Sequence, residues 1–142
     1  MINYQPDFID AKYKSHVRRT YAEIVEESKD EILRGIERAE EVGEEIISMI
    51  KRRNPKLKAS GSGGLWIYNA GFVIDYQIKT REGSIMTRIF PRTIARVHVD
   101  TGNCAWDEKT IHIDKSIKDK EIHDFGKRLE LEKRFKFCDF LV

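Results

Sequence analysis

The feature that most constrains the fold is a long aliphatic stripe between Ser28 and Pro55. Apolar side chains recur there every three or four positions, at Ile32, Leu33, Ile36, Ala39, Val42, Ile46, Ile47 and Ile50. This spacing places them on one face of an α-helix, and that face must be buried against another layer of structure. The residue before Pro55 is pushed out of helical geometry, so we expect the helix to end near "KRRNP".

A shorter amphipathic helix is predicted before this one, over residues 12–27, where Tyr13, Val17 and Tyr21 recur at helical spacing. The segment "KASGSGG" at 58–64 is predicted to be a flexible connector between a helical half and a strand-rich half. It lacks the Lys-Ser or Lys-Thr pair that a phosphate-binding loop needs after its glycines. We therefore expect two helices before the connector and no phosphate loop in it.

Beyond the connector the hydrophobic period changes from 3.6 to 2, which is typical of β-strands. Turn residues at Asn69–Gly71 predict a hairpin, and Pro91 predicts a break before a later strand. The strands are expected at 65–68, 72–79, 84–90 and 93–100.

The helical period returns after Ser116, while the final "RFKFCDFLV" is compatible with either a helical turn or a strand. Together these patterns predict a single α+β domain over residues 1–142. An N-terminal helical pair, about 1–57, is expected to pack on a four- to five-stranded antiparallel sheet at about 64–115. A C-terminal helix is expected at about 117–134.

Composition agrees with a globular chain, because 40% of the 142 residues are hydrophobic and 35% are charged with both signs mixed. No apolar run reaches the roughly 18 residues of a membrane span, and the N-terminus lacks the pattern of a signal peptide. We therefore expect a cytoplasmic protein with no membrane partner. Cys104 and Cys138 are then expected to be free thiols, and the sequence predicts no metal site and no cofactor.

Positive charge is concentrated in the middle of the chain. From Lys51 to Asn103 there are ten basic residues and only three acidic ones, although the whole chain carries a formal charge of +2. Such a segment is typical of a nucleic-acid footprint, and equally of a solvated surface that balances an acidic helix. If it binds nucleic acid, the candidate contact residues are Arg52, Arg53, Lys79, Arg88 and Arg92.

Two His-x-Asp triplets, at 98–100 and 112–114, lie on either side of a glycine-containing loop. Strand alternation puts each His-Asp pair on the face opposite the core. A four-residue turn that buries Trp106 against Ile111 would hold the two histidines roughly 20 Å apart. A nine-residue loop over 101–109 would instead bring His98 opposite His112, so two registers stay open.

A metal-free site is the other possibility for these residues. Histidine exchanges protons near neutral pH, and a neighbouring cation stabilises the charge of a phosphorane. His98, Arg96 and His112 are therefore the candidate catalytic residues for cleavage of RNA by its own 2′-hydroxyl group.

The stretch 44–79 resembles the core of RelE-type ribonuclease toxins in its helix end, its glycine segment and its "LW" strand. The matching residues are Leu65, Trp66, Gly71, Tyr76 and Ile78. The resemblance implies helices on an antiparallel sheet and mRNA cleavage without a metal. Asn69, Val73 and Asp75 stand where those toxins carry Arg or Lys. The resemblance therefore bears on the fold more than on the activity.

Three functions follow from these patterns. The first is an RNA- or nucleotide-binding protein that acts as a metal-independent ribonuclease. The second is a non-catalytic protein-binding module, such as an inhibitor or antitoxin-like partner, for which the acidic second helix offers a surface. The third is a small-ligand binder that sequesters a nucleotide by stacking it on Trp66 or Trp106.

Overall fold

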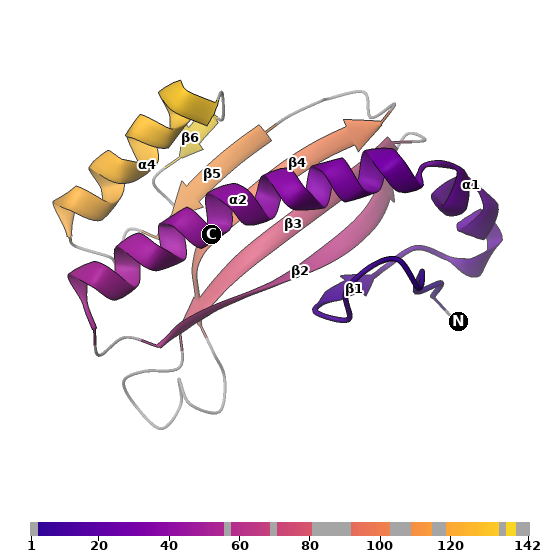
Figure 1. Ribbon diagram of the computed structural model, residues 1–142, viewed down its shortest axis with the longest axis horizontal. Helices are drawn as coiled ribbons and strands as arrows, with labels where there is room; N and C mark the ends of the chain where they lie inside the picture. Colours follow the sequence, from indigo (N-terminus) through magenta and orange to yellow (C-terminus); the bar gives the residue numbers. More distant parts are fainter. Residues whose placement is uncertain are drawn as a thin grey trace.

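The computed structural model describes residues 3–55, 58–68, 71–80, 92–102, 109–114, 119–133 and 136–138. In these residues, helices pack on one face of a single mixed β-sheet (Figure 1). This arrangement confirms the predicted α+β class. No helix within the same ranges is long and apolar enough to cross a membrane.

Ten elements follow one another along the described chain. In chain order they are β1 (Tyr13–Ser15), the 3-10 helix η1 (Arg19–Tyr21), α1 (Ala22–Glu27), α2 (Lys29–Arg53), β2 (Ala59–Tyr68), β3 (Gly71–Thr80), β4 (Arg92–Gly102), β5 (Lys109–Ile113), α4 (Lys120–Lys133) and β6 (Lys136–Cys138). The long predicted helix is α2, and the predicted C-terminal helix is α4. The final segment, for which the sequence left helix and strand open, contains the strand β6.

The six strands lie in the sheet in the same order as in the chain. The central strands, β2 to β5, are antiparallel, as predicted. At the edges, β1 runs parallel to β2 and β6 runs parallel to β5, so the sheet is mixed. The strand expected at 84–90 lies outside the described residues, and β3 pairs directly with β4.

The core lies between α2 and the sheet. The buried face of α2 consists of Ile32, Gly35, Ile36, Ala39, Val42, Gly43, Ile46, Ile47 and Ile50. This is the predicted stripe with two glycines added and without Leu33, which is only half-buried. The stripe packs against alternate residues of β3 and β4, among them Ile74, Tyr76 and Val97. Ile122 and Leu129 of α4 extend the same core over β5.

Tyr76 fills the space between α2 and β2. A Cβ atom at Gly43 of α2 would overlap one side of its ring, and a Cβ atom at Gly61 of β2 would overlap its hydroxyl end. The hydroxyl group donates a hydrogen bond of 2.7 Å to Glu44, and burial together with this bond raises the pKa of Tyr76. A tyrosine ring therefore needs bare backbone on both sides to fit here.

The prediction that 58–64 is a flexible connector is wrong, because residues 59–64 form the first half of β2. Gly63 is paired with Tyr76 across the sheet, and a Cβ atom at Gly63 would overlap the ring of Tyr13. The two tyrosine rings lie 6.2 Å apart between their centroids. Glycine is therefore needed in this strand where two buried tyrosine rings pack against its backbone. Composition alone does not distinguish such a strand from a glycine-rich loop.

The predicted helix over 12–27 is also partly wrong. Its first residues form β1, in which Tyr13 and Ser15 are buried while Lys14 between them is exposed. Tyr13 and Val17 are four residues apart, and this separation fits both a helix and a strand. Only Ala22–Glu27 is α-helical.

We expect Gly61→Ala to lower the free energy of unfolding by about 1–3 kcal/mol, because the added methyl group overpacks the Tyr76 ring. Urea denaturation followed by circular dichroism measures the change. Ser60→Ala is the matched control on the neighbouring exposed position and should stay within about 0.5 kcal/mol of wild type. Equal stability of Gly61→Ala and wild type would show that the ring does not need the bare backbone.

Candidate functional site

The side chains that alternate with the core residues lie on the sheet face opposite α2, called here the outer face. Strand pairing assigns to it Lys14 of β1, Ser62 and Trp66 of β2, Asp75 and Gln77 of β3, Arg96, His98 and Asp100 of β4, and Thr110 and His112 of β5. The predicted alternation of β3 and β4 is thus confirmed. Polar side chains dominate this face from one edge of the sheet to the other.

The pairing of β4 with β5 brings both His-x-Asp triplets together. His112 lies opposite Arg96, and His98 lies opposite Thr110, two residues away on the same face. Diagonal neighbours of this kind are about 7–8 Å apart. The register with a four-residue turn, which would hold the histidines roughly 20 Å apart, is therefore wrong. The alternative with a nine-residue loop is nearer, although His112 faces Arg96 rather than His98.

We call Arg96, His98 and His112 the His–Arg cluster. Each member has a neighbour on the outer face that holds its side chain. Nε2 of His98 lies 2.9 Å from Oδ1 of Asp100, and Nε2 of His112 lies 3.2 Å from Oγ1 of Thr110. Nε of Arg96 lies 3.3 Å from Oδ1 of Asp75, an ion pair without the geometry of a hydrogen bond.

The cluster is partly exposed to solvent, whereas the carboxylates that contact it are buried. The side chains of Arg96 and His98 are 41% and 30% exposed, whereas that of Asp100 is fully buried. Asp75 is also buried, and it accepts a second contact of 3.0 Å from the amide of Gln77. Two buried carboxylates of the outer face therefore orient a partly exposed guanidinium and imidazole. This arrangement can exchange protons and bind an anion.

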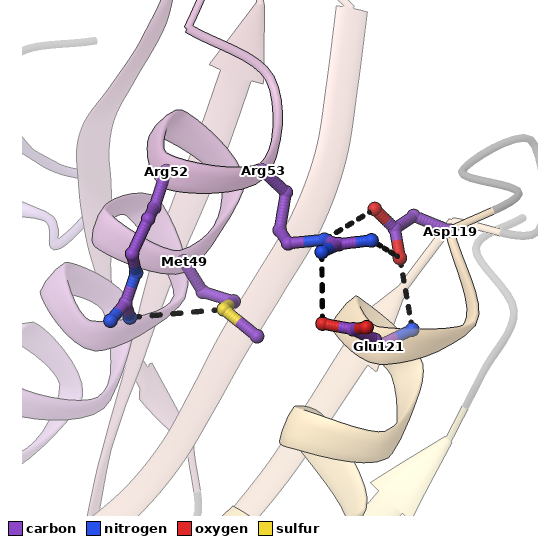
Figure 2. Close-up of polar contacts among 5 residues, drawn as sticks. All are labelled: Met49, Arg52, Arg53, Asp119 and Glu121. Carbon is purple, nitrogen blue, oxygen red and sulfur yellow. Dashed lines mark hydrogen bonds and ion pairs between the residues drawn. The ribbon is translucent and has the colours of Figure 1, made fainter.

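Two of the predicted nucleic-acid contacts lie at the end of α2, on the helical side of the sheet. Arg53 connects α2 to the start of α4, with ion pairs of 2.8 Å to Asp119 and 3.0 Å to Glu121 (Figure 2). Arg52 directs Nη2 toward Sδ of Met49 at 3.8 Å. The structure therefore does not bring these two arginines to the outer face, and the contacts of Arg53 are structural.

The other three predicted nucleic-acid contact residues lie in different parts of the chain. Lys79 of β3 lines a pocket near the β1 edge of the sheet. Arg92 is the exposed first residue of β4, paired with Thr80. Arg88 lies outside the described residues.

The sequence reasoning missed the contribution of β1. His16, which follows β1, stacks on Trp66 of β2 with 4.4 Å between ring centroids and 10° between ring planes. Lys14 lines the same pocket as these two rings. The alternation in "KYKSHV", with buried residues at 13, 15 and 17, is the signal that could have revealed a strand with a basic outer face.

Comparisons with known proteins add no relative to this description. No protein-family model matches the chain, and no curated protein or solved structure matches it at a significant level.

The contact between α2 and α4 gives a prediction. The hydrogen bond from Arg53 lowers the pKa of Asp119 below its ordinary value of 3.8. A lowered carboxyl pKa means that the stabilisation is present near neutral pH and is lost as the pH falls through the Asp119 pKa of the folded protein. In Arg53→Gln, Asp119 should titrate at higher pH, as measured by NMR of its carboxyl carbon.

The control is Arg52→Gln, which removes a neighbouring charge that does not contact Asp119. It should leave the titration of Asp119 near that of wild type. The backbone amide of Glu121 still donates to Asp119 in Arg53→Gln, so the pKa should return only in part. An unchanged Asp119 titration in Arg53→Gln would contradict the described contact.

Proposed function

We propose that the protein binds RNA on the outer face of its sheet and cleaves it without a metal ion at the His–Arg cluster. The observation that carries the proposal is the β4–β5 register, in which two imidazoles and a guanidinium share one exposed patch. This combination is what phosphodiester transfer to a neighbouring hydroxyl group requires.

The proposed reaction uses the RNA 2′-hydroxyl group as the nucleophile. His98 accepts the proton of that group while its oxygen forms a bond to phosphorus. The bond from phosphorus to the 5′-oxygen breaks, and His112 donates a proton to this leaving oxygen. The products are a 2′,3′-cyclic phosphate and a free 5′-hydroxyl group. Arg96 stabilises the negative charge of the phosphorane that forms before the 5′-oxygen leaves.

The roles of the two histidines follow from their neighbours. Asp100 is buried and lies against His98, so it orients the ring and faces the positive charge that forms when His98 accepts a proton. The ring of His112 is held by the hydroxyl group of Thr110. A separation of about 7–8 Å between diagonal positions leaves room for a phosphate group between the rings. Both rings are carried by strands, which hold them more rigidly than loops would.

The first test is cleavage of a fluorescently labelled single-stranded RNA in the presence of EDTA. Wild type should cut it, and either His98→Ala or His112→Ala should reduce the rate by about 10²–10⁴-fold, because each removes one proton-transfer group. His123→Ala is the matched control, since this histidine belongs to α4. Its rate should equal that of wild type.

Binding is measured separately, by fluorescence anisotropy with an RNA whose 2′-hydroxyl groups are replaced by 2′-methoxy groups. Affinity should fall steeply as salt increases, because cations on the protein replace the counterions of the phosphates. Cleavage that EDTA abolishes, or that persists at the wild-type rate in both histidine variants, would contradict the catalytic proposal. The absence of salt-dependent binding would contradict the RNA proposal as a whole and favour a protein partner.

A further inference from the structure

A pocket of about 320 Å³ lies on the outer face at the β1 edge of the sheet. Its floor is β2, and its sides come from β1 and β3. The residues that line it are Ala11, Lys12, Lys14, His16, Ser62, Gly63, Gly64, Trp66, Gln77 and Lys79. We call it the Trp66 pocket, and the His–Arg cluster is not part of it.

The lining of the Trp66 pocket is cationic. It contains three lysines and no carboxylate. The ammonium group of Lys12 forms an ion pair of 3.1 Å with Glu40 of α2, so its charge is balanced. Among the described residues, neither Lys14 nor Lys79 forms an ion pair. Two lysines without an ion pair among the described residues, in a pocket that Ser62 also lines, favour an anionic ligand.

One wall of the pocket is aromatic. The indole of Trp66 lies over Gly64, where a Cβ atom would be only 2.6 Å from the ring, and it stacks on His16. Although it is held in this way, Trp66 remains 36% exposed. An exposed indole is a surface on which a nucleobase stacks, with about 1–3 kcal/mol per base.

We propose that the Trp66 pocket binds a single nucleotide, with its phosphate group at Lys14 and Lys79 and its base against Trp66. The volume of the pocket is at the lower end of the roughly 300–1,000 Å³ of small-molecule sites, which suits a mononucleotide better than a larger ligand. This site is separate from the proposed cleavage site and does not depend on any reaction there.

The probe for this proposal is adenosine 5′-monophosphate, which has no internucleotide bond to cleave. In a Trp106→Phe background Trp66 is the remaining tryptophan, because the chain has two. Titration should change the Trp66 fluorescence, and calorimetry on the wild-type protein should give the affinity. We expect the double variant Lys14→Gln/Lys79→Gln to weaken binding at least about tenfold, since two ion pairs with the phosphate are lost.

Two further variants separate the base contact from the charge contact. Gly64→Ala puts a methyl group against the indole and displaces Trp66, so it should weaken binding of the nucleotide about tenfold without removing a charge. Lys51→Gln removes one positive charge from the end of α2 and is the matched control. Its affinity for the nucleotide should equal that of wild type.

Inorganic phosphate and adenosine are the comparison ligands, and each should bind more weakly than the nucleotide. No binding of the nucleotide at millimolar concentration, or equal affinity for phosphate and nucleotide, would overturn the proposal. So would unchanged affinity in the lysine double variant. His98→Ala should bind the nucleotide normally, so a failure of RNA cleavage and a failure of this pocket are observed independently.

Discussion

The packing of Tyr76 between two glycines is the constraint on which the rest of the structure depends. The ring fits only where α2 and β2 both present bare backbone, at Gly43 and Gly61. Its position fixes how closely the helix approaches the sheet, and pairing with Gly63 fixes the register of β2 against β3. A second ring, that of Tyr13, uses the same strand in the same way and brings β1 to the edge of the sheet.

Once these rings define the core face, the outer face follows from alternation. Ser62, Gln77, Arg96 and His112 then form one row across four strands, because each is paired with the next. The row begins in the Trp66 pocket and ends in the His–Arg cluster. At about 4.8 Å between strands it spans roughly 14 Å. The two proposed sites therefore lie at opposite ends of one row of outer-face side chains.

Sequence reasoning succeeded where burial repeats with one period. The aliphatic stripe of α2 and the alternation of β3 and β4 were predicted because each side of the element is chemically distinct. It failed in β2, which was predicted to be a connector, because its glycines make room for tyrosine rings from other strands. It also failed in the β4–β5 register, because alternation assigns side chains to a face but does not fix which residues lie opposite one another. The cluster residues were therefore predicted correctly to share one face, but their closeness on that face required the structure.

The strands lie in the sheet in the order in which they occur in the chain, and this order affects how the chain folds. Each central strand pairs with the strand next to it in sequence, so most sheet contacts close short loops. Relative contact order is lower for such a meander than for a sheet that pairs strands distant in the chain, and a lower contact order is associated with faster folding. The parallel edges, β1 and β6, pair across intervening helices and close longer loops. Their docking is expected to follow the meander rather than to nucleate it.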